Sequence, residues 1–185
     1  KISVKNRDIK YRSNIYGDYN YSNICAAITI GLHFGIDSSK IQDALSSFEL
    51  KNNRSQVIDI NGKEIILDAY NANPTSVSNA IESFSNVENS KAIILGDMFE
   101  LGSNSHDEHK KIVELLSIKN IDSCYFIGED FFKVKSKNES FYFYKTKEDF
   151  YNSDDEISES HILIKGSRGM KMEEIIKNKL KWKNT

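Results

Sequence analysis

Three short polar stretches carry the side chains best suited to bind a small polar ligand. They read DAYNANPTS at residues 68–76, GDMFELG at 96–102 and KGSRGMK at 165–171. Each follows a short apolar run of the kind that forms a buried strand. All three are therefore expected at strand ends, where a ligand can reach them.

The first stretch combines a carboxylate, a phenol and two amides with the only proline of the chain. Asp68 at a strand end can accept hydrogen bonds from both hydroxyls of a ribose, and amides near a helix start suit an anion. Pro74 fits the first helical turn because its missing N–H needs no partner there. A capped helix start, with Asn73 as the N-cap, is the structural alternative. It leaves Asp68, Tyr70 and Asn71 unexplained, so a binding role and a structural role both remain open.

The third stretch places Lys165, Ser167 and Arg168 among glycines that allow close approach to the backbone. These donors precede an expected helix, whose dipole adds to them, and predict a pocket for a carboxylate or another anion. A surface turn with incidental charge is the alternative. The spacing G-x-x-x-x-G-K-[ST] of a nucleotide phosphate loop occurs nowhere in the sequence.

The second stretch carries two acids whose role the residues leave open. Asp97 and Glu100 can order the loop, contact an ammonium group or be solvated. His106 and His109 follow at a spacing of three residues, on a turn that we expect to be exposed beside two lysines. A metal site is a weak alternative on such a turn, and we expect no metal.

The elements that must position these stretches are predicted from hydrophobic periodicity. After residue 56, two strand-like runs flank Asn61-Gly62, a strong hairpin signal. Helices and strands then alternate: we expect helices at about 74–86, 104–117, 146–152 and 169–180, and strands at about 91–96, 123–128, 140–145 and 161–166. This alternation predicts a doubly wound, mostly parallel α/β sheet, in which ligands bind beyond the carboxyl ends of the strands.

The first part of the chain has a different pattern. Residues 1–16 are expected to be extended, and 22–35 and 37–50 have the apolar spacing of two helices. Residues 51–56 show no periodicity and predict a linker. We expect the acidic stretch 153–160 to be a solvated loop.

Composition narrows the classes of partner. The chain has 185 residues, of which 28% are charged, and a formal net charge of -2, so bulk charge favours neither nucleic acid nor an anionic membrane. No apolar run approaches the roughly 20 residues that span a bilayer. Cys25 and Cys124 lie far apart in apolar settings and are expected to be buried free thiols, which favours a cytoplasmic location.

Five stretches, in order GDYNYSN, NNRSQ, DAYNANPTS, GDMFELG and KGSRGMK, resemble the C-terminal portion of the Mur ligases. The resemblance is to the branch that adds D-Ala-D-Ala to UDP-MurNAc-tripeptide in peptidoglycan biosynthesis. It implies that residues 1–52 form the end of a central ATP-binding domain and that residues 57–185 form a Rossmann-like C-terminal domain.

The resemblance also implies a reaction. ATP, with Mg2+, would phosphorylate the tripeptide carboxylate, and the amine of D-Ala-D-Ala would then attack the acyl phosphate. The phosphate loop, the magnesium-binding glutamate and the UDP-sugar domain of the family lie outside these residues. We therefore expect no complete catalytic set and no activity from this chain alone, and a full-length enzyme that acts as a monomer.

Individual roles are likewise implied only by the resemblance. The residues expected to contact ATP are Asn20, Arg54 and Asp68, the last of them at the ribose. Those expected to line the cleft near the γ-phosphate and the dipeptide are Tyr70, Asn71 and Asn73. Those expected to receive the carboxylate of D-Ala-D-Ala are Lys165, Ser167 and Arg168. The sequence departs from the family pattern at Tyr19, where a histidine often stands, and at Ala69, which replaces an acid.

Two alternatives to this function remain. The chain can be a non-catalytic Rossmann-like module that binds a different small anion at 165–171. It can also be part of a sibling Mur ligase that adds another amino acid, although those enzymes carry a motif like H-x-P where this sequence has NANP.

Overall fold

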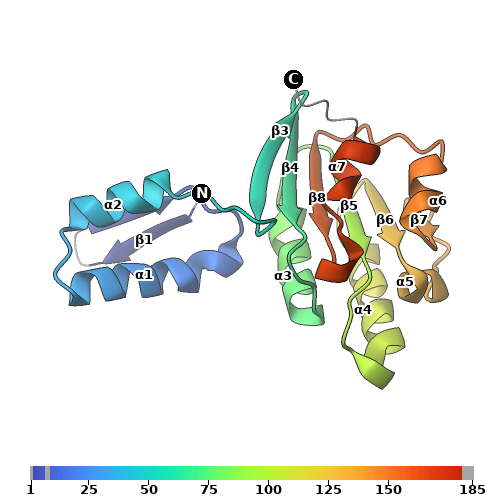
Figure 1. Cartoon of the computed structure of the whole chain (residues 1–185), viewed down its shortest axis with the longest axis horizontal. Helices are drawn as coiled ribbons and strands as arrows, with labels where there is room; N and C mark the ends of the chain where they lie inside the picture. Colours follow the sequence, from blue (N-terminus) through green and yellow to red (C-terminus); the bar gives the residue numbers. More distant parts are fainter. Residues whose placement is uncertain (1, 7–8, 181–185) are drawn as a thin grey trace. The chain divides into compact units, whose positions relative to one another are not determined.

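The computed structural model describes residues 2–6 and 9–180. The chain divides into two compact units, Lys1–Lys51 and Asn52–Thr185, and both are drawn in Figure 1. The division falls at the start of the segment that was predicted to be a linker.

The first unit is a small α/β element. Its strands β1 (Ile2–Asn6) and β2 (Ile9–Ser13) form an antiparallel pair. A 3-10 turn η1 (Asp18–Asn20) leads into helix α1 (Tyr21–His33), which is followed by α2 (Ser38–Ser47). The two helices and the extended start were predicted correctly. Their apolar residues form one shared core: Ile2, Val4, Tyr11, Ile24, Ile28, Ile41 and Leu45.

The second unit contains a six-stranded sheet. Its order is β3-β4-β8-β5-β6-β7, with the bounds β3 (Gln56–Ile60), β4 (Lys63–Asp68), β5 (Lys91–Gly96), β6 (Ser123–Ile127), β7 (Phe141–Tyr144) and β8 (His161–Lys165). The first two strands form the predicted hairpin around Asn61 and Gly62, both of which have positive φ, as a tight hairpin turn requires. The other neighbouring pairs are parallel, which confirms the predicted fold class.

Helices cover both faces of this sheet. They are α3 (Pro74–Ser85), α4 (Ser105–Ser117), α5 (Glu129–Lys133), α6 (Lys147–Asn152) and α7 (Glu174–Asn178). Figure 1 shows α3 and α4 on one side of the sheet and α6 and α7 on the other. All six residues of β5 are buried between these layers. Among the described residues, no helix is long and apolar enough to cross a membrane.

Three local expectations were wrong. The short helix α5 was missed, because five residues carry too little periodicity to be seen. The last helix begins at Glu174 and not near residue 169, since η3 (Arg168–Met170) is a 3-10 turn and Lys171 adopts a left-handed φ of 48°. Cys25 is only partly buried, whereas Cys124 is buried; both are free thiols.

Candidate functional site

The three polar stretches follow β4, β5 and β8, which are neighbours in the sheet. Because these strands are parallel, their carboxyl ends meet at one edge. In the register of β4 and β8, Asp68 lies opposite Lys165, and Leu95 of β5 lies opposite the same lysine. The fold therefore brings together the loops that the sequence singled out.

A buried ion pair lies at the centre of this edge. The ammonium of Lys165 is 2.6 Å from Oδ2 of Asp68, and the two side chains are 3% and 15% exposed. The same ammonium donates to the backbone oxygen of Asn71 at 3.0 Å. Lys165 thus lies behind the loop and holds it, in addition to any role toward a ligand carboxylate.

The other oxygen of Asp68 accepts hydrogen bonds from the start of the second unit. The backbone N–H of Ser55 donates to Oδ1 at 3.0 Å, and the hydroxyl of Ser55 lies 3.4 Å from it. A carboxylate has about four lone-pair sites. With Lys165 on Oδ2, Asp68 retains capacity for about one further donor.

The loop after β4 is a capped helix start, as its sequence suggested. The side chain of Asn73 accepts from the backbone N–H of Ser76 at 2.8 Å, and the hydroxyl of Ser76 accepts from the N–H of Asn73 at 3.1 Å. Pro74 is the first residue of α3. The amide oxygen of Asn71 accepts from the N–H of Ala72. Tyr70, Asn71 and Asn73 remain exposed, so these local bonds leave part of each side chain open to a ligand.

Replacing Asn73 by alanine is expected to destabilise the second unit by about 1 kcal/mol, because it removes the N-cap of α3. Urea unfolding followed by amide resonances of α3 measures this loss. Asn86→Ala at the exposed other end of the same helix is the control, and Asn73→Asp should restore most of the stability, since aspartate also caps. An Asn73→Ala loss no larger than that of Asn86→Ala would show that the cap contributes little.

The loops after β5 and β8 are linked to each other. The N–H of Ser167 donates to the backbone oxygen of Asp97 at 3.2 Å, and the N–H of Phe99 donates to the hydroxyl oxygen of Ser167 at 2.8 Å. Gly166 lies so close to Gly96 that an added Cβ would be 3.1 Å from the Cα of Gly96. Ser167, which is 3% exposed, therefore joins the two loops in addition to any role toward a ligand.

Asp97 joins its loop to the start of α5. Its carboxylate accepts the backbone N–H groups of Asp130 and Phe131, at 3.1 and 3.0 Å, at the start of α5. Burial raises the pKa of the Asp97 carboxyl above its ordinary value, while the hydrogen bonds from Phe131 and Asp130 oppose that shift. The first of the options that the sequence left open for Asp97, ordering of the loop, is the one that the structure shows. Glu100 is exposed with a positive φ of 64°.

His109 is buried, contrary to our expectation of an exposed turn. Its Nε2 accepts the N–H of Met98 at 3.0 Å, and its Nδ1 lies 2.7 Å from the backbone oxygen of Ser105. Both contacts fit the neutral imidazole with its proton on Nδ1. His109 thus holds the loop after β5 through the backbone N–H of Met98. Its spacing to His106 did not suggest this role.

Two further predicted site residues have other partners. Arg168 is exposed and pairs with Glu173 at 2.8 Å. Asn20 belongs to the first unit, where its amide donates to the backbone oxygen of Tyr16 at 2.8 Å. Within residues 2–6 and 9–180, no group of three or more His, Cys, Asp or Glu side chains is arranged to hold a metal ion.

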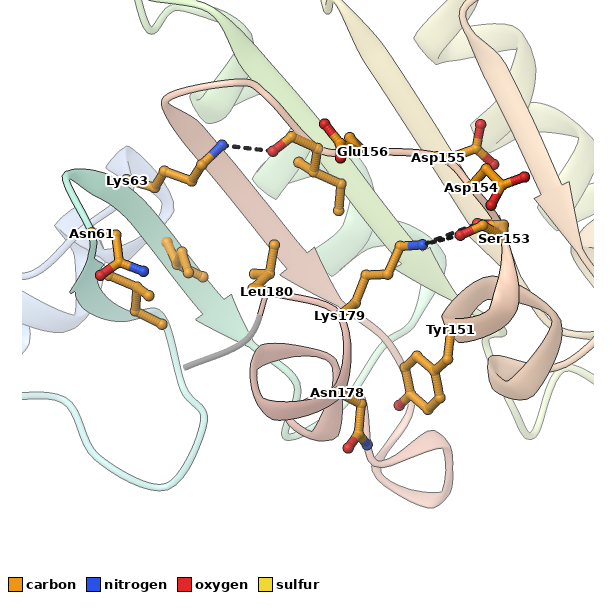
Figure 2. A pocket seen from close by; sticks show the side chains of 13 residues that line it. Asn61, Lys63, Tyr151, Ser153, Asp154, Asp155, Glu156, Asn178, Lys179 and Leu180 are labelled. Carbon is orange, nitrogen blue, oxygen red and sulfur yellow. Dashed lines mark hydrogen bonds between the residues drawn. The ribbon is translucent and has the colours of Figure 1, made fainter. Parts of the chain in front are cut away.

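A cavity of about 430 Å³ lies away from this edge, between the β3–β4 turn, the acidic loop after α6 and the end of α7. Figure 2 shows the ammonium groups of Lys63 and Lys179 directed at this loop. They donate to the backbone oxygens of Ile157 and Ser153, at 2.6 and 2.8 Å. These lysines fasten the loop that the sequence predicted to be solvated, and no predicted site residue lines the cavity.

Comparisons with known proteins identify relatives of this chain. A family model described as "Mur ligase, glutamate ligase domain" matches residues 53–168. The UDP-N-acetylmuramoyl-tripeptide--D-alanyl-D-alanine ligases of Bacillus subtilis and of Buchnera aphidicola subsp. Baizongia pistaciae are each 34% identical to the chain. The alignments cover 96% and 98% of this chain but 41% and 40% of those proteins. The chain thus spans about two fifths of the length of these curated relatives.

Solved structures share the fold. A ligase from Acinetobacter baumannii, described as adding D-alanyl-D-alanyl to UDP-N-acetylmuramoylalanyl-D-glutamyl-2,6-diaminopimelate, matches 94% of this chain and 39% of its own, with a TM-score of 0.80 at 23% identity. MurF ligase from Thermotoga maritima, in complex with ADP, matches 96% of this chain and 44% of its own, with a TM-score of 0.74 at 19% identity. The family model and the two relatives lead to one conclusion: the chain belongs to the Mur ligase family.

Proposed function

We propose that this chain is the C-terminal part of an ATP-dependent ligase that adds D-Ala-D-Ala to UDP-MurNAc-tripeptide in peptidoglycan biosynthesis, and so serves cell-wall growth, cell shape and cell division. The observation that carries the proposal is the Asp68–Lys165 pair, which holds the exposed Tyr70–Asn73 loop at the carboxyl edge of the sheet. The names of the relatives support the same substrates. The module alternative gains no support from these relatives.

The nucleotide is proposed to contact Asn20, Arg54 and Asp68. Asp68 has capacity for about one further hydrogen bond, so it fits one ribose hydroxyl and not two. The ADP bound to the Thermotoga relative supports a nucleotide ligand. ATP would supply the phosphoryl group that activates the tripeptide carboxylate, and Mg2+ would be held mainly by residues of the ligase that lie outside this chain.

The dipeptide is proposed to bind where the loops after β4 and β8 meet. Tyr70, Asn71 and Asn73 offer exposed polar groups there, and Arg168 supplies an exposed guanidinium that suits a carboxylate. Lys165 and Ser167, which also hold these loops in place, are proposed to help receive the same carboxylate. We propose a cytoplasmic enzyme that acts as a monomer, with residues 1–52 as the end of its ATP-binding domain and 57–185 as its C-terminal domain.

Adding D-Ala-D-Ala to the isotope-labelled chain is expected to move the amide resonances of Asn71, Asn73, Ser167 and Arg168. L-Ala-L-Ala is the matched control, because it carries the same charges with the opposite chirality. Equal shifts with both dipeptides, or none at millimolar ligand, would contradict the dipeptide site on this domain. Shifts with lysine or diaminopimelate in place of D-Ala-D-Ala would favour a sibling ligase.

A further inference from the structure

The segment that carries Arg54 is fixed to the loop after β4 on both sides of the arginine. On one side, the backbone oxygen of Asn53 accepts the N–H of Tyr70 at 3.1 Å. On the other, the N–H of Ser55 donates to Asp68 at 3.0 Å. These contacts continue the β3–β4 hairpin beyond its last paired residues, Gln56 and Leu67.

The side chain of Arg54 lies on the ring of Tyr70. Its Cζ atom is 3.4 Å from the ring centre, which is a close cation–π contact. Both residues are exposed, with Tyr70 at 42%. Among the described residues, no carboxylate forms an ion pair with Arg54. One face of the guanidinium is therefore covered by the ring, while its charge and its N–H edges stay available to an anion.

The backbone around Arg54 is strained. Asn52, Asn53 and Ser55 have positive φ values of 61°, 59° and 44°, which residues other than glycine seldom adopt. Such conformations persist where surrounding contacts impose them. The contacts to Tyr70 and Asp68 hold the backbone on both sides of Arg54.

We propose that Tyr70 is a positioning residue: its ring face holds the guanidinium of Arg54 ready for the polyphosphate of a nucleotide. This rests on the proposed ATP contact of Arg54. It gives the ring of Tyr70 a function of its own, whereas the resemblance implied only that Tyr70 lines the cleft. Because the ring already holds the side chain, Arg54 loses less conformational entropy on binding an anion than a free arginine does.

The test uses the whole 185-residue chain, with inorganic triphosphate as the probe, titrated and followed by NMR. Tyr70→Phe keeps the ring, so its affinity should match that of the parent chain. Tyr70→Leu removes the ring and should weaken binding about two- to fivefold. Arg54→Gln should weaken binding at least as much. Lys137→Gln, which removes one exposed charge from the α5–β7 loop, is the control for net charge.

A second measurement reports the contact without any ligand. The Nε–H signal of Arg54 is shifted by the ring current of Tyr70, so it should move in Tyr70→Leu and stay in Tyr70→Phe. An unmoved signal in Tyr70→Leu would refute the stacking. If Arg54→Gln weakens triphosphate binding but Tyr70→Leu does not, the positioning role is wrong while the ATP contact stands. If neither change matters, the ATP contact fails, and the inference fails with it.

Discussion

Replacing Lys165 by methionine is expected to lower the free energy of unfolding of the second unit by about 3–5 kcal/mol, because it leaves a largely buried carboxylate without its cation. The ammonium of Lys165 lies 2.6 Å from Asp68 with only 3% of the lysine side chain exposed. Methionine has a similar length but supplies no charge and no donor. The backbone oxygen of Asn71 also loses the hydrogen bond that the ammonium donates.

The chain offers a matched control for this change. Lys91 is also buried, at 4% exposure, but its ammonium donates to the backbone oxygens of Ser85 and Val87 and not to a carboxylate. Lys91→Met should therefore cost only about 1–2 kcal/mol, the loss of hydrogen bonds to neutral groups. The double change Lys165→Met with Asp68→Asn should cost less than Lys165→Met alone, since it removes both charges of the pair.

Urea unfolding followed by amide resonances of β5 and β8 is the suitable measurement, because the two units of the chain need not unfold together. The same spectra report the loop after β4, which should lose its order in Lys165→Met. A Lys165→Met chain that is as stable as Lys91→Met would show that the ion pair contributes nothing beyond ordinary hydrogen bonds.

Replacing Gly128 by alanine is expected to destabilise the second unit by about 3 kcal/mol or more, from backbone strain and steric overlap together. Gly128 has φ 130° and ψ 164° just before α5, a region open essentially to glycine alone. An added Cβ would lie 2.2 Å from the carboxylate of Asp97, which cannot withdraw without losing its bonds to Asp130 and Phe131.

Gly62→Ala shows the cost of a positive φ without steric overlap. Gly62 also has a positive φ, of 78°, but an added Cβ meets nothing within 4 Å. Its replacement should cost about 1–2 kcal/mol from strain alone. Thermal or urea unfolding of both variants gives the difference, which measures the overlap at Asp97 together with the greater backbone strain at φ 130°. Equal losses at the two positions would show that the Asp97 carboxylate moves aside freely.

The sequence by itself determined the architecture of the second unit and the edge of the sheet at which its three polar loops meet. Short apolar runs that alternate with amphipathic helices suffice for a parallel sheet, because the periodicity of each element is local. The NG turn, the cap at Asn73 and the proline at the start of α3 are also local, and all three are confirmed. The motifs at the strand ends were enough to identify the family, but not the contacts of their side chains.

Only the tertiary structure decided what those side chains contact. Lys165 and Asp68 are 97 residues apart in the chain, and they meet because β8 lies between β4 and β5. Strand order depends on the packing of the whole sheet, and no local pattern encodes it. The same holds for His109, whose burial under Met98 depends on how α4 packs against the sheet. Spacing along the chain thus predicted which polar loops follow the strands, whereas packing decided which of their polar groups are committed to the protein and which stay exposed.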